Sequence, residues 1–169
     1  MLRDKNLIPL SRQHQHALAL CVRIDRAQPV AASDLEAWQA EIKQEFEQEI
    51  GIHFAAEENF IFPVASNFSD LVSLVCELST EHDWLRREFS RAEQGSMSTN
   101  DLPHFARKLA LHIRKEERVL FERLQSLLKP EEMATLGVSL NQALREASQA
   151  CVLPRQATRI QAAKDRSET

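Results

Sequence analysis

Apolar residues recur every three or four positions along most of this 169-residue chain. This spacing puts them on one face of an α-helix, so the chain reads as a series of amphipathic helices. No stretch shows the alternation of apolar and polar residues that is typical of a β-strand. We therefore expect an all-α protein, with long helices at about residues 9–27, 33–62, 69–93 and 101–128.

Prolines and capping residues set the expected helix ends. Pro29 ends the first helix, and Pro63 ends the second, because a proline ring does not fit inside a helix. Residues 33–36 read Ser-Asp-Leu-Glu, which is a capping box at the start of the second helix. Ser69 or Asp70 is expected to cap the third helix. Long helices with short connections predict an up-down-up-down four-helix bundle.

The C-terminal part of the chain has a different pattern. Two short helices are expected at about residues 131–136 and 140–150, separated around Gly137. Beyond them the chain is mostly polar, which is typical of disorder. We expect one helical domain over residues 1–150, with a disordered tail over residues 151–169.

Composition narrows the class of function. The net charge is −4 with both signs interspersed, so the chain lacks the basic stripe of a nucleic-acid-binding protein. No long apolar run predicts a membrane span or a signal peptide. The three cysteines are widely spaced, which favours a reducing compartment over a disulfide framework. We expect a cytoplasmic protein that binds neither nucleic acid nor membrane, and the sequence leaves its oligomeric state open.

One motif, His-x-x-x-Glu-Glu-x-x-(Ile/Leu)-Phe, occurs twice. The first copy places His53 four residues before Glu57, and the second places His112 four residues before Glu116. Residues four apart lie on the same face of a helix, and here that face is the apolar one. A carboxylate is rarely buried unless it is paired or bound to a metal. The two copies therefore predict a cation in the core.

The first and third helices offer further histidines. His82 lies in the apolar stripe of the third helix. The first helix has His14 and His16, which lie about 200° apart around the helix axis, so only one can face the core. The apolar residues of that helix cluster on the side of His14. We therefore predict that His14, and not His16, faces the core. The chain then reads as a twofold pseudo-repeat.

A symmetric arrangement would give two metal ions two histidines each, with both glutamates bridging. Imidazole and carboxylate ligands suit iron, manganese or zinc. The competing interpretation is a buried His–Glu hydrogen-bond network without metal. Glu58 and Glu117 are expected to support the site or to lie at the surface, and His16 and His104 to be ordinary polar residues. The predicted metal ligands are His14, His53, Glu57, His82, His112 and Glu116.

At these residues the chain resembles the hemerythrin-like family of HHE cation-binding domains, over about residues 10–128. The resemblance implies a four-helix bundle that holds two iron ions, oxo- or hydroxo-bridged, on the same histidines and glutamates. Oxygen-carrying members have a further histidine four residues after the third-helix histidine, where this chain has Arg86. A guanidinium stays protonated and cannot ligate a metal. We therefore expect an open coordination position on the iron held by His82 and His112, and Arg86 either at the surface or paired with a carboxylate such as Glu81.

The resemblance also bears on function. It implies a non-haem di-iron protein that binds, senses or reacts with a small ligand such as O2, nitric oxide or peroxide. The alternative is an enzyme: a di-iron oxidase or peroxidase, or a protein of nitric-oxide detoxification or iron–sulfur repair. We expect rapid air oxidation of the reduced protein without reversible oxygen carriage.

Overall fold

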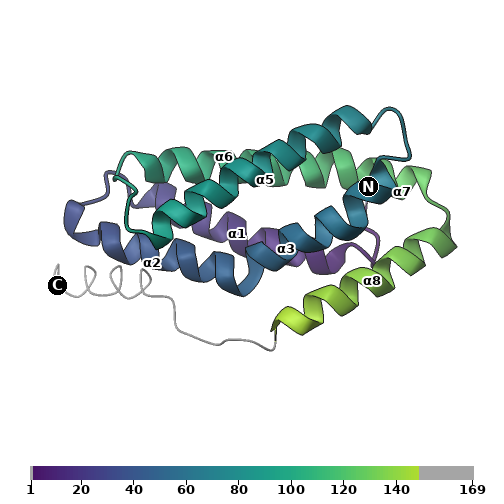
Figure 1. Ribbon diagram of the computed structural model, residues 1–169, viewed down its shortest axis with the longest axis horizontal. Coiled ribbons are helices and arrows are strands. Elements are labelled where there is room, and N and C mark those ends of the chain that lie inside the picture. The colour runs from purple at the N-terminus through teal and green to yellow at the C-terminus, as the bar shows by residue number, and fades with distance from the viewer. Residues whose placement is uncertain (1, 149–169) are drawn as a thin grey trace.

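Four long helical segments run roughly along the longest axis of the molecule in the computed structural model, which describes residues 2–148 (Figure 1). These described residues contain no strand, so the expected all-α bundle is confirmed. The first and third segments are the single helices α1 (Ile8–Arg26) and α5 (Val72–Glu93). The second segment is interrupted by π-helical turns and comprises η1 (Ala32–Asp34), α2 (Leu35–Glu45), η2 (Phe46–Ile50), α3 (Gly51–Ala56), η3 (Glu57–Ile61) and α4 (Phe62–Ala65). The fourth comprises α6 (Asp101–Lys115), η4 (Glu116–Leu120) and α7 (Phe121–Leu127).

Apolar side chains form two separate clusters in the core. One includes Ile24, Ile42 and Phe105, from the end of the bundle where α1 finishes and α6 begins. The other includes Leu10 and Leu124, from the opposite end. Each long segment carries its motif residues between the parts that supply these clusters. The apolar stripes therefore hold the helices together on both sides of a polar middle layer.

A single helix, α8 (Pro130–Ser148), replaces the two short helices expected at the C-terminus. It packs along the outside of the bundle against α3, η2 and η3 (Figure 1). The predicted break at Gly137 is wrong, because this glycine lies inside the helix where α8 meets the N-terminal segment. A Cβ at this position would lie 2.3 Å from Oδ1 of Asn6. The tail predicted over residues 151–169 falls outside the described residues.

The expected caps do not form. Ser33 lies in the 3-10 turn η1, and α2 begins without a side-chain cap. Helix α5 begins at Val72, and its N-cap residue is Leu71, whose apolar side chain cannot cap it. The carboxylate of Asp70, one residue earlier, pairs with Arg123. Capping residues here bind one another or a distant helix, which local sequence does not reveal.

The second segment also passes Pro63, where it was expected to stop. It continues as α4 to Ala65, and Pro63 lies in the first turn of α4. The π-helical turn η3 ends at Ile61, so the regular hydrogen-bond ladder is already interrupted where the proline enters. No helix among residues 2–148 is both long and apolar enough to cross a membrane.

Candidate metal centre

The two motif glutamates begin π-helical turns at equivalent places. Glu57 is the first residue of η3, and Glu116 is the first residue of η4. A π-helical turn contains an extra residue, and such turns inside α-helices occur frequently at functional sites. The His-x-x-x-Glu spacing also fits an ordinary α-helix, so the sequence gives no indication of these π-helical turns.

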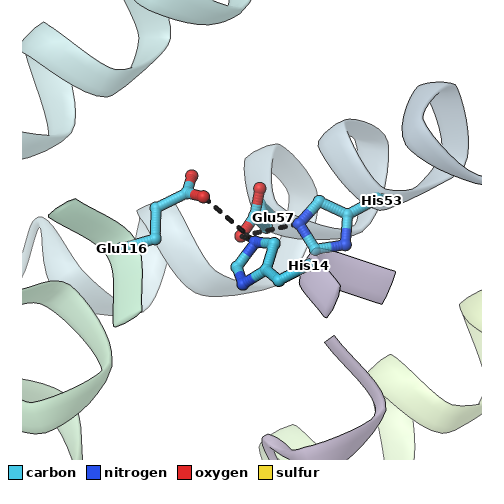
Figure 2. A group of neighbouring side chains, drawn as sticks. All are labelled: His14, His53, Glu57 and Glu116. Atoms are coloured by element: carbon cyan, nitrogen blue, oxygen red, sulfur yellow. Dashed lines mark ion pairs between the residues drawn. The ribbon is translucent and has the colours of Figure 1, made fainter. Parts of the chain in front are cut away.

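All of the predicted metal ligands lie together in the middle of the bundle. Each is at most 3% exposed to solvent. Figure 2 shows part of the cluster, where the His14 and His53 side chains and both carboxylates meet in a common space. Helix α1 supplies His14, α5 supplies His82, and the second and fourth segments supply the remaining members: His53, Glu57, His112 and Glu116.

The cluster divides into two groups that share both carboxylates. One group is His14, His53, Glu57 and Glu116, and the other is Glu57, His82, His112 and Glu116. Within each group, every residue can offer one ligand atom within 4.8 Å of the others. The structure therefore gives each group two imidazoles and a share of the same two carboxylates.

Each carboxylate directs one oxygen towards each group. Oε1 of Glu57 lies 3.3 Å from Nε2 of His53, while Oε2 lies 3.4 Å from Nε2 of His82. Oε2 of Glu116 lies 3.1 Å from Nε2 of His14, while Oε1 lies 2.9 Å from Nε2 of His112. This is the arrangement that a pair of bridging carboxylates requires.

These inward-facing atoms make no hydrogen bond of adequate geometry within the described residues. The unsatisfied atoms are Nε2 of all four histidines and both oxygens of Glu57 and Glu116. Buried polar atoms are otherwise nearly always hydrogen-bonded. Imidazole nitrogens and carboxylate oxygens are also the donor atoms of iron, manganese and zinc sites. The donor set therefore fits two metal ions.

The opposite nitrogen of each imidazole is held firmly. Nδ1 of His14 donates to Glu117 over 2.7 Å, and Nδ1 of His82 donates to Glu58 over 2.8 Å when Nε2 is the metal-facing atom. The expectation that both glutamates could support the site is confirmed by these contacts. Such bonds fix the ring orientation and the tautomer of a ligating histidine.

The other two histidines are held by Gln13, which the sequence reasoning missed, and by Glu81, which it named only as a carboxylate that Arg86 could pair with. Nδ1 of His53 donates to Oε1 of Gln13 over 3.0 Å. Nδ1 of His112 donates to Oε2 of Glu81 over 2.9 Å. Gln13 and Glu81 each stand directly before a predicted ligand, and that adjacency is the one signal that could have suggested them.

Each of the three supporting carboxylates also contacts a cation. Arg86 binds Glu58 through two hydrogen bonds of 2.7 and 2.8 Å. Arg86 therefore pairs with a supporting carboxylate, as one of the two expectations had it, but this carboxylate is Glu58 and not Glu81. Glu81 pairs with Lys115 instead. Arg3 contacts the Glu117 carboxylate at 2.7 Å, so the N-terminal segment also reaches the centre's surroundings.

The carboxylates shift the pKa values of the first- and third-helix histidines upward. Burial lowers the pKa of His14, but contacts with Glu116 and Glu117 outweigh it and raise the pKa to about 9. Burial also lowers the pKa of His82, and contacts with Glu116 and Glu57 raise it to about 9. In the metal-free chain, protons on these rings compensate the buried negative charge.

The motif residues of the fourth segment behave similarly. Burial lowers the pKa of His112, whereas the nearby Glu116 and Glu81 raise it to about 10. Burial raises the pKa of Glu116, but His112, His14 and His82 bring it well below its usual value. Burial likewise raises the pKa of Glu57, and its histidine neighbours outweigh this and lower it. Both carboxylates are therefore charged and ready to bind a cation.

The remaining histidines lie outside the cluster. The His16 side chain is 52% exposed and contacts Glu49 on the surface. His104 is exposed, and its ring lies edge-on to Trp84. The helical phase of α1 thus separates His14 from His16 as its apolar stripe predicts.

A small cavity of about 10 Å³ adjoins the cluster. Ala17, Ile50, Leu109 and Ile113 form part of its apolar wall. A space of this size holds about one water molecule. Larger grooves of about 520 and 760 Å³ lie elsewhere on the molecule, and none of the predicted ligands lines either of them. The residues around the small cavity also include Gln13, His14, His53, His112 and Glu116.

Comparison with known families gives a match over most of the chain. The family model described as Hemerythrin HHE cation binding domain matches residues 9–124, which include all six predicted ligands. Searches of curated proteins and of solved structures gave no significant match.

Proposed function

This chain belongs to the family of hemerythrin HHE cation-binding domains, and we propose that its buried centre binds two iron ions and, beside them, a small ligand. Cation binding follows from the family, whereas the identity of the metal as iron, the presence of two ions and the binding of a small ligand are our proposal. The observation that best supports this proposal is the set of buried atoms at the centre of the cluster. Four imidazole nitrogens and four carboxylate oxygens face one another without hydrogen bonds in the described chain.

The protein would divide the ligands evenly. His14 and His53 would hold one ion, and His82 and His112 the other, with Glu57 and Glu116 shared between them. Bound iron would supply redox chemistry and coordination positions for an exogenous ligand. The chain itself orients the imidazoles through Nδ1 and surrounds the site with apolar clusters. Such a setting excludes bulk water from the ions.

The size of the adjoining cavity supports a small ligand. A space of about 10 Å³ suits a diatomic molecule or peroxide better than any organic substrate. The structure places this cavity against His14, His53 and His112 rather than beside His82. We therefore propose ligand entry on that side, in place of the open position expected from the substitution of a histidine by Arg86.

Metal analysis with a matched pair of variants on α1 tests the binding proposal. The purified protein should contain close to two irons per chain. His14→Ala should remove most of this metal, because it deletes a buried inward-facing nitrogen. His16→Ala should leave the metal content unchanged, because that ring lies on the surface. Equal metal content in both variants, or none in the unmodified protein, would contradict the proposal.

The response to oxygen, nitric oxide and peroxide separates binding from catalysis. The reduced protein should oxidise in air and should not return to the reduced state when oxygen is removed, as judged by its absorption spectrum. Nitric oxide or azide should bind and shift the spectrum without being consumed. Steady consumption of peroxide or nitric oxide would instead establish the enzymatic alternative.

A further inference from the structure

Gln13 and Glu81 occupy equivalent positions in the two halves of the bundle but differ in charge. Each stands directly before a predicted ligand, Gln13 before His14 and Glu81 before His82. Each also accepts a hydrogen bond from the histidine of the next long segment, which is His53 for Gln13 and His112 for Glu81. One half therefore uses a neutral amide where the other half uses a carboxylate.

The supporting contacts of the other two histidines, His14 and His82, are alike in the two halves, because a carboxylate accepts in both. Glu58 accepts from His82 over 2.8 Å, and Glu117 accepts from His14 over 2.7 Å. These two glutamates are themselves equivalent, because each follows a motif glutamate directly. The pair formed by His82 and His112 is thus backed by two carboxylates. The pair formed by His14 and His53 is backed by one carboxylate and one amide.

We propose that Gln13 makes the His14/His53 position the weaker of the two metal sites. This inference rests on the proposed function, in which the centre binds two ions. A carboxylate that accepts from Nδ1 withdraws the proton towards itself and leaves Nε2 a better electron donor. A neutral amide attracts the Nδ1 proton less strongly, so it increases the electron donation of Nε2 by less. Changing such a supporting partner typically alters metal affinity by about 10–100-fold.

The surroundings of Gln13 also suit a neutral group. Glu81 is balanced by Lys115, which lies three residues after His112. The equivalent residue, three after His53, is the buried Ala56. Gln13 and both of its site's histidines line the small cavity. The weaker and more exchangeable ion would therefore lie where an exogenous ligand arrives.

A cobalt titration of the metal-free protein tests this proposal, with chelator competition to resolve two binding constants. The unmodified protein should bind a first Co²⁺ at least about tenfold more tightly than a second. Gln13→Glu should strengthen the weaker site about tenfold or more and narrow the gap. Glu81→Gln, the reciprocal control, should weaken the tighter site by a similar factor. Circular dichroism of each metal-free variant checks that the fold is intact.

Crystals grown with one equivalent of Co²⁺ locate the tighter site by anomalous scattering. The ion should lie between His82 and His112. Equal binding constants, a first ion at His14 and His53, or an unchanged weaker site in Gln13→Glu would overturn the inference while leaving two-ion binding intact. Absence of any bound cobalt would overturn the proposed function, and this inference with it.

Discussion

The two halves of the bundle share a ligand arrangement but surround it differently. In each half a single helix brings one histidine, and an interrupted segment brings a histidine and a glutamate four residues apart. The glutamate begins a π-helical turn in both, at Glu57 and at Glu116. The repetition extends to backbone detail. The two halves therefore have in common both the ligand spacing and the π-helical turn at the motif glutamate.

The supporting residues show where the halves diverge. Arg86 lies one turn after His82 and neutralises Glu58, whereas the residue one turn after His14 is Leu18. The cation for Glu117 comes instead from Arg3, at the start of the chain. Equivalent charge balance is thus reached from unrelated parts of the sequence. The outer helix α8 covers the second segment, including the π-helical turns η2 and η3 of that segment.

The variants with the largest expected effect test whether metal binding needs a histidine from each half. His53→Ala and His112→Ala should each lose most of the bound metal, because each removes one of the two imidazoles of its group. Each should also destabilise the protein by about 3–5 kcal/mol, because buried carboxylate charge is left without its partner. Metal analysis and urea unfolding measure the two effects.

His104→Ala is the control for this pair of variants. The residue lies on α6, as His112 does, but it is exposed. Its replacement should change neither metal content nor the unfolding midpoint. If one of the two core variants kept both metal ions, the need for a ligating histidine from each half would be refuted.

Helix periodicity explains why the sequence predicted so much of the centre. Steps of three and four residues put His53 and Glu57 on the apolar face, and the same rule distinguished His14 from His16. Glu58 was expected to be a supporting or surface residue because it sits one position off that face. Its actual partner, His82, depends on how two helices cross. Gln13 and Arg3 escaped prediction for the same reason, since both act through contacts distant in sequence.

The errors in the predicted helix ends have a related cause. Glycine and proline were read as local breaks, but Gly137 and Pro63 both lie inside helices. The glycine is required by the close approach of another segment, and the proline follows a π-helical turn. Both reasons belong to tertiary structure, which overrides local propensity.

The second prediction concerns pH and rests on one histidine of the first half, His14, and two of the second, His82 and His112. The pKa values of His14 and His82 are raised to about 9, and that of His112 to about 10, from 6.5. Protons bound more tightly in the folded state stabilise it fully below pH 6.5, and this stabilisation is lost as the pH rises through 9 and 10. Metal-free protein should therefore lose on the order of a few kcal/mol over this range.

Urea unfolding in the presence of chelator, at a series of pH values, measures this loss. The metal-loaded protein should not show the same decline, because the bound ions replace the protons on the imidazoles. A metal-free protein whose stability rose with pH, or stayed level, would show that these histidines are neutral in the folded state.

The smallest expected effect concerns α8, the element that only one half contacts extensively. Gly137→Ala replaces glycine by the best helix former, which would stabilise an isolated helix by about 1 kcal/mol. In this fold the new Cβ would lie 2.3 Å from Oδ1 and 2.6 Å from Cβ of Asn6, so the N-terminal segment or α8 must move. Such overpacking costs about 1–3 kcal/mol, and we expect it to outweigh the gain in helix propensity. The unfolding midpoint should fall, while metal content stays unchanged because none of the predicted ligands lies on α8.

Gly95→Ala is the matched control, since its penalty comes from a positive φ of 66° in a loop without any nearby atom. Loss of metal in Gly137→Ala alone would show that α8 holds the second segment, and with it Glu57, in position.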